Sequence, residues 1–145
     1  MSTSTYFRSR VDTRPLAAVL AAGDLLALTV FIVAGASHHS ERPFANPEIV
    51  IGALAPFVLA WAGVAFVAGL YTADAVISVR RAIGWTTPVW VFAALLAHGL
   101  RATPLFRGNT GVLFLLVTLA VGGVLVVGWR TLASVIVGHR SLTVG

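Results

Sequence analysis

Long apolar runs alternate with short polar segments along this chain, and four of the runs are long enough to cross a lipid bilayer. They cover residues 16–36, 49–71, 83–100 and 110–130. An α-helix rises about 1.5 Å per residue, so about 20 apolar residues match the hydrocarbon core of a membrane. The pattern predicts an all-α protein, an integral membrane bundle of four transmembrane helices that forms a single domain over residues 1–145.

The four runs differ in how strongly they indicate a membrane span. The second, from Ile49 to Tyr71, carries no formal charge, and Pro56 inside it would bend a membrane helix without ending it. The third, over residues 83–100, is the shortest, so we expect it to be short, tilted or bent, and whether it crosses completely stays open. After the fourth run the apolar pattern continues to Val137, which predicts a helix that projects beyond the bilayer.

A cleaved secretory signal peptide is the alternative interpretation of the first run. Arg8, Arg10 and Arg14 resemble the basic segment of such a peptide, and residues 34–36 resemble a cleavage site. The apolar segment of a signal peptide is usually about 7–15 residues long and lacks an acid such as Asp24. We therefore expect an uncleaved transmembrane helix.

Composition supports a membrane protein and argues against several other classes. Hydrophobic residues make up 58% of the chain and charged residues only 10%, whereas soluble domains average about 25% charged residues. The net charge of +5 comes from arginines at the ends of the apolar runs, a distribution that membrane topology explains and nucleic-acid binding does not. The chain has no cysteine, and the common nucleotide-binding, hydrolase and zinc-protease motifs are absent. We expect neither enzyme activity nor a cofactor.

The distribution of arginine predicts the orientation in the membrane. Seven of the ten arginines lie on one side of the predicted bundle, and the richer side is usually cytoplasmic. Both termini are therefore predicted to be cytoplasmic, and the same topology brings the rings of Tyr71, Trp85 and Trp129 to the cytoplasmic interface. The seven are Arg8, Arg10, Arg14, Arg80, Arg81, Arg130 and Arg140, and the other three are Arg42, Arg101 and Arg107.

Small residues recur four positions apart in each predicted span. Membrane helices associate by close backbone packing, so such pairs predict contact faces, although alanine and glycine are also simply common in this chain. The pairs are Ala17 and Ala21, Ala65 and Gly69, Ala93 and Ala97, and Thr118 and Gly122.

Short motifs spread over nearly the whole chain resemble a family of small multi-pass membrane proteins of unknown function, the DUF3054 proteins. The motifs are Gly23–Leu28 followed by Ser37 and His38, then Pro56, Phe57 and Trp61, and finally Gly128, Trp129 and Arg130. The resemblance implies a multi-pass membrane protein. Because the family has no established activity, it implies no catalytic residue.

Asp24 is the most informative single residue. It lies about 12 Å into the first predicted span, where an acid costs roughly 2.5–3.5 kcal/mol on insertion scales. One interpretation makes it a carboxyl group that handles protons or cations inside the bundle. Another makes it a neutral acid that hydrogen-bonds to a threonine, a tryptophan or a backbone carbonyl of a neighbouring helix. A third pairs it with a cation such as Arg130, whose side chain would have to reach inward.

Polar residues gather on the predicted outer side of the membrane. The imidazoles there are zinc-type ligands and titrate near neutral pH, but their spacing is poor for a metal and nearby arginines would repel a cation. We expect solvated interfacial histidines and no metal site. Arg101 and Arg107 could instead hold an anionic headgroup or solute, or simply extend from helix ends. The set comprises His38, His39, Glu41, Glu48, His98, Arg101 and Arg107.

Two functions remain open at this stage. Asp24 favours movement of a proton or small solute, and four short helices are too few to enclose a large cavity alone, so this hypothesis implies a homo-oligomer. The absence of a second charge inside the predicted spans favours a non-catalytic accessory or structural subunit that packs against a membrane-protein partner.

Trp61, near the middle of the second span, is a candidate for lining a cavity, with packing against another helix as the alternative. Membrane lipids are the expected surroundings in either case.

Overall fold

The computed structural model describes residues 15–39, 42–106, 108 and 110–143, with side chains through residue 139, and this part of the chain is helical apart from its turns. Three long helices come first, and the last helical stretch contains a π-helical segment. In chain order the elements are α2 (Pro15–His38), α3 (Pro47–Val67), the 3-10 helix η1 (Ala73–Val76), α4 (Val79–Arg101), α5 (Val112–Val117), the π-helix η2 (Thr118–Gly122) and α6 (Gly123–Thr143).

Four helical stretches are long and apolar enough to cross a membrane, which confirms the predicted all-α architecture. They are Pro15–His38, Pro47–Val67, Val79–Arg101 and Val112–His139. The third is the least apolar, yet it has 23 residues, because α4 begins at Val79 and continues through Pro88 without a break. Ser78 caps its start by accepting a hydrogen bond from the backbone N–H of Arg81 at 3.3 Å.

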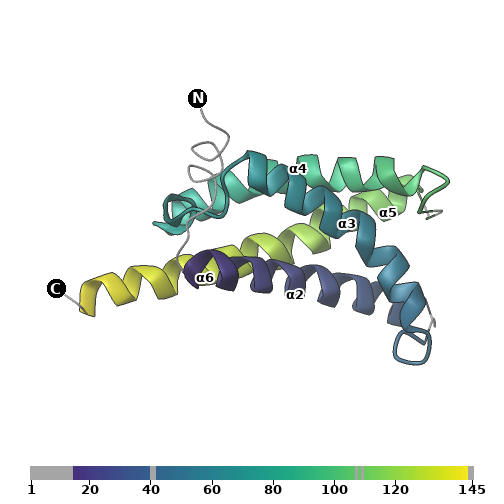
Figure 1. The fold of residues 1–145 in the computed structure, drawn as a ribbon, viewed down its shortest axis with the longest axis horizontal. Helices are drawn as coiled ribbons and strands as arrows, with labels where there is room; N and C mark the ends of the chain where they lie inside the picture. The colour runs from purple at the N-terminus through teal and green to yellow at the C-terminus, as the bar shows by residue number, and fades with distance from the viewer. Residues whose placement is uncertain (1–14, 40–41, 107, 109, 144–145) are drawn as a thin grey trace.

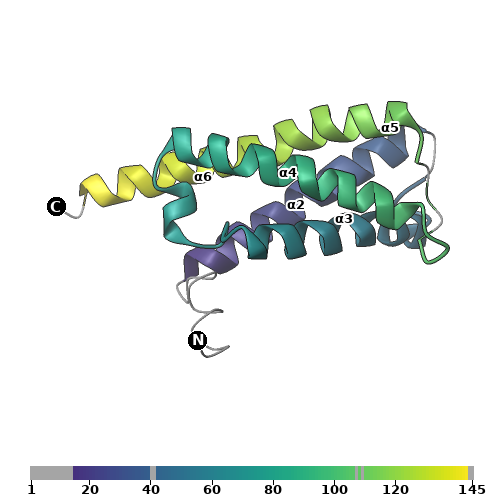
Figure 2. The same cartoon turned by 90° about the horizontal axis from the view of Figure 1, so that it is seen from above.

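The four stretches form a closed bundle in which each helix packs against two others. Helix α2 packs on α3, α3 on α4, α4 on α6, and α6 returns to α2, while α3 crosses the bundle obliquely (Figures 1 and 2). The start of α2, the turn that contains η1 and the end of α6 lie at one end of the bundle, and the other two connections lie at the opposite end. The C-terminal part of α6 extends beyond the other helices (Figure 2).

The start of the first helix, α2, and the end of the last helix, α6, therefore lie at the same end of the bundle. Which side of the membrane that end faces stays a prediction. Of the arginines on which the predicted orientation rests, Arg8, Arg10, Arg14 and Arg107 lie outside the described residues, and so does the side chain of Arg140.

The small-residue pairs occupy contact faces in three of the four predicted cases. Both members are buried in the pairs on α3 and its following turn, on α4 and on η2, whereas on α2 Ala17 is buried and Ala21 is exposed. The core between the helices is formed largely by aromatic and small side chains. It includes Phe57, Trp61, Trp90, Ala65, Ala93, Ala97 and Val126.

Candidate functional site

A buried ion pair joins the first helix of the bundle to the last. The Nε atom of Arg130 donates a hydrogen bond to Oδ1 of Asp24 at 2.9 Å, and its Nη2 atom donates to Oδ2 at 2.5 Å. Arg130 is 0% exposed and Asp24 is 1% exposed. This two-point geometry matches the planar guanidinium to the carboxylate and is the strongest form of the interaction.

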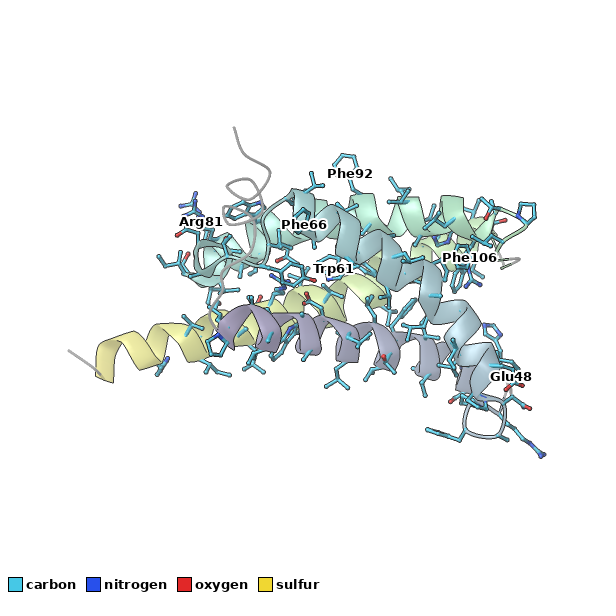
Figure 3. All side chains as sticks on the ribbon, viewed as in Figure 1. Glu48, Trp61, Phe66, Arg81, Phe92 and Phe106 are labelled. Atoms are coloured by element: carbon cyan, nitrogen blue, oxygen red, sulfur yellow. The ribbon has the colours of Figure 1, made fainter. Side chains whose placement is uncertain are left out.

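Trp61 of α3 completes the coordination of the carboxylate. Its Nε1 atom donates to Oδ2 of Asp24 at 3.0 Å, so three donors from two helices hold the two oxygens. The indole is 2% exposed and lies in the interior, whereas the exposed Phe92 points away from the bundle (Figure 3). The ring of Trp90 lies 6.0 Å from it, centroid to centroid. In this structure Trp61 is therefore a hydrogen-bonding and packing residue.

Aromatic rings flank the guanidinium group of Arg130. Its Cζ atom lies 5.7 Å from the ring centroid of Trp61 and 5.1 Å from that of Tyr71. Both distances are within the range of cation–π attraction. Tyr71 lies in the turn after α3, where burial and the negative charge of Asp24 raise the pKa of its hydroxyl, with Arg130 opposing. The ring next to the arginine is thus a neutral phenol.

The turn that ends α3 supplies the remaining acceptor for Arg130. Gly69 adopts a φ of 71°, a left-handed conformation that residues with a Cβ rarely take. The backbone N–H groups of Gly69 and Leu70 donate to the carbonyls of Phe66 and Ala65, which closes the helix end in a Schellman motif. The carbonyl of Leu70 then accepts a hydrogen bond from Nη1 of Arg130 at 2.5 Å. One glycine therefore orients a backbone acceptor toward the arginine.

A second contact between helices is built on glycine next to the π-helical segment. A Cβ atom on Gly122 would lie 2.4 Å from Cζ2 of Trp90, so only glycine admits the indole at this position. The Nε1 atom of Trp90 donates to the carbonyl of Leu119 at 3.3 Å, within η2. A π turn displaces the regular helical hydrogen bonds, which leaves carbonyls open to side-chain donors. The local irregularity thus accompanies the α4–α6 contact.

Two of the three interpretations of Asp24 describe parts of this site. The carboxylate has both the tryptophan donor and the Arg130 partner that were considered separately. Arg130 lies inside the fourth membrane-length stretch, because the helix continues past it to Thr143. The expectation that no second charge lies inside the spans is therefore wrong. In a sequence, a charge near the end of an apolar run indicates the boundary of a span, although a helix that continues can turn that side chain inward.

The sequence model of a family described as "Protein of unknown function (DUF3054)" matches residues 21–133, which is more than half of the chain. The chain belongs to the DUF3054 family. The matched stretch contains both partners of the ion pair. No curated protein and no solved structure shows significant similarity to this DUF3054 protein.

The polar residues predicted on the outer side of this DUF3054 protein separate into two places. His38 and His39 lie at the end of α2, are exposed, and contact each other with ring centroids 5.7 Å apart. His98 and Arg101 lie at the end of α4 and are 8% and 9% exposed. Arg107 lies outside the described residues. Among the residues that the structure describes, no three histidines or acids are grouped as metal ligands.

In this protein, His98 and Arg101 are packed among aromatic rings. The imidazole ring centroid lies 5.2 Å from that of Phe114, and the Arg101 Cζ atom lies 5.0 Å from the same ring. Arg101 also donates from Nη1 to the carbonyl of Ala53 at 3.3 Å. The Nδ1 atom of His98 lies 3.1 Å from the carbonyl of Ala94, while its buried Nε2 atom has no hydrogen-bond partner. His98 is therefore buried and not a solvated interfacial residue.

Sequence reasoning did not place Leu70, Tyr71 or Trp129 in contact with the ion pair or its surroundings. The Leu70 acceptor is a backbone atom, so its side chain gives no signal, although the glycine before it is a usual helix terminator. Tyr71 and Trp129 were expected as rings at the membrane interface. In the structure Tyr71 lies against Arg130, and Trp129 packs with Leu20, Val76 and Ala133. The place of both rings at the membrane interface stays a prediction.

Proposed function

We propose that this protein is a non-catalytic structural or accessory subunit of a larger assembly in the cell membrane, and that the Asp24–Arg130 pair holds its helices in register. The observation that carries the proposal is the complete engagement of the carboxylate. Both oxygens accept hydrogen bonds from Arg130, Oδ2 also accepts one from Trp61, and the group is 1% exposed.

A carboxyl group that carries protons must be able to take up a proton and release it to water. In this site a proton on either oxygen of Asp24 would displace a hydrogen bond from Arg130 and leave the arginine charge buried without its partner. Breaking one half of a buried pair costs about 3–5 kcal/mol. The contacts therefore favour a fixed connection between α2 and α6 over a cycling proton site.

Outward-facing glycines on α3 support the accessory role. Gly52 and Gly63 are eleven residues apart and thus lie on nearly the same face of the helix. A Cβ atom on either would meet nothing within 4 Å, so packing within the chain does not require glycine at these positions. Glycine in a helix is unfavourable by roughly 0.5–1 kcal/mol, and in membranes it allows another helix to approach closely. We infer that this face of α3 contacts a membrane-protein partner or a second copy of the chain.

Movement of a proton or small solute through an oligomer is the second candidate, favoured by a different observation. The Nε2 atom of His98 and the Oγ1 atom of Thr118 are buried polar atoms without a hydrogen-bond partner. Buried groups of this kind call for an explanation, and water along a polar path is one. The His98 ring is in contact with that of Phe114, which is one helical turn before Thr118.

Proton flux in proteoliposomes separates the two candidates. The transport hypothesis expects Asp24→Asn to abolish proton flux while the protein stays folded. The structural hypothesis expects the wild type and Asp24→Asn to give the same background flux, and Asp24→Asn to have the lower melting temperature. Flux that exceeds that of empty liposomes and is lost in His98→Phe or Asp24→Asn would overturn our proposal.

Assembly is tested with a matched pair of glycine variants. We expect the tagged protein, solubilised gently at native expression level, to migrate above the size of the 15.2 kDa chain in its detergent micelle. Gly63→Leu should abolish this larger size, whereas Gly35→Leu on α2 should not. The two variants are matched because a Cβ atom on either residue meets nothing within the chain. A monomer in the wild type would contradict the subunit role.

A further inference from the structure

A shallow surface cavity, open over most of its extent, lies at the start of α4 and is lined in part by two arginines. It has a volume of about 470 Å³ and is lined by Ser78, Arg80, Arg81, Gly84 and Trp85. It lies outside the Asp24–Arg130 site, and Arg81 marks its position at the end of the bundle opposite Glu48 (Figure 3). Nothing in the proposed subunit role uses it.

The charge of the two arginines is not neutralised by the part of the protein that the structure describes. Both side chains are exposed, and no described carboxylate forms a salt bridge with either guanidinium group. The Cζ atom of Arg81 lies 5.3 Å from the ring centroid of Trp85, which holds one guanidinium over the indole. The cavity therefore presents positive charge beside an aromatic surface.

Gly84 lines the cavity without a side chain. It lies one helical turn after Arg80, is exposed, and a Cβ atom there would meet nothing within 4 Å. A larger side chain at this position would fill part of the cavity without altering any charge. A substitution at Gly84 therefore tests the volume of the cavity separately from its charge.

The position of the cavity indicates the ligand. Arg80 and Arg81 come just before the apolar run of residues 83–100, so we expect them to lie where a membrane-spanning helix meets the headgroup layer. Clusters of arginine at this level attract anionic lipids, and guanidinium groups bind phosphate oxygens through paired hydrogen bonds. We propose that this cavity binds the phosphate headgroup of an anionic phospholipid, with Arg80 and Arg81 on the phosphate and Trp85 beside the glycerol and upper acyl region.

Lipid titration of the detergent-solubilised full chain tests this site. Phosphatidylglycerol and phosphatidylcholine are added separately, and bound lipid is measured by native mass spectrometry. We expect phosphatidylglycerol to bind more tightly, and Arg80→Gln and Arg81→Gln each to weaken it about five-fold with phosphatidylcholine binding unchanged. Gly84→Leu should weaken it as well, although the charge is the same. Circular dichroism without lipid confirms that each variant is folded.

The control variant is Arg42→Gln, which removes one charge from an exposed residue in the loop after α2. Equal loss of phosphatidylglycerol binding in Arg42→Gln would show that only overall charge matters, and full binding by Gly84→Leu would show that the cavity is not the site. Inorganic phosphate forms the third arm. If it displaces phosphatidylglycerol at equal concentration, the site takes soluble phosphate and the lipid assignment is wrong.

Discussion

Trp129 lies so close to Gly23 that a Cβ atom on residue 23 would be 1.9 Å from the Cε2 atom of the indole. The two residues immediately precede Arg130 and Asp24 in the sequence. The absence of a side chain at position 23 therefore lets α6 approach α2 at the level where the ion pair forms. Close backbone approach and charge pairing act at the same point of the bundle.

Gly23→Ala should lower the melting temperature, because the added methyl group must displace the partly buried indole of Trp129 and separate α2 from α6. Gly35→Ala is the matched control on the same helix, since a Cβ atom there meets nothing within 4 Å. Alanine is favoured over glycine in helices by about 1 kcal/mol, so the control should be unchanged or slightly more stable. Thermal unfolding in detergent measures both, and equal melting temperatures for the two variants would contradict the contact.

Removal of one partner of the ion pair should destabilise the protein more than removal of both. Asp24→Leu and Arg130→Leu each leave a buried charge unpaired, and we expect a loss of about 3–5 kcal/mol for each. The double variant should recover most of this loss, because well-packed apolar residues can replace a buried pair at little net cost. Chemical unfolding of the four proteins gives the coupling free energy. Additive losses in the double variant would show that the two residues act independently.

Gly69→Ala should destabilise the turn after α3 by about 1–2 kcal/mol, because a residue with a Cβ is strained at a φ of 71°. The same change displaces the Leu70 carbonyl that accepts from Arg130. Gly35→Ala, at an exposed position of α2, removes a glycine without that strain and serves as the control. Comparison of their melting temperatures tests the role of the turn, and a Gly69→Ala protein as stable as wild type would exclude it.

The membrane orientation can be read from single cysteines, since the natural chain contains none. Asp74→Cys and His139→Cys lie at exposed positions at one end of the bundle, and Ala45→Cys lies in the loop at the other. If the arginine distribution sets the orientation, a membrane-impermeant thiol reagent should label only Ala45→Cys in intact cells. All three should react after the membrane is permeabilised. If only one of Asp74→Cys and His139→Cys is labelled in intact cells, the two positions lie on different sides of the membrane. Either α4 or the last helix would then not cross as predicted.

The hydrophobic pattern by itself determined the number and approximate position of the helices. A span needs about 20 apolar residues whatever its neighbours are, so each run could be recognised alone. The family resemblance could be recognised for a similar reason, because its short motifs lie in order along the chain. The importance of Asp24 also followed from the sequence, since an acid inside an apolar run is expensive wherever it points.

Only the tertiary structure decided which residues meet. In a membrane protein, the lipid-facing side of a helix is as apolar as the side facing its neighbours, so no polar stripe shows the rotation of α2 or α3. The pairing of Asp24 with Arg130 depends on that rotation and on the close approach at Gly23, across 106 positions of sequence. The Leu70 acceptor depends on a backbone conformation at Gly69. Hydropathy reflects the free energy of transferring each residue into the membrane by itself. These contacts depend instead on how separate helices are aligned relative to one another.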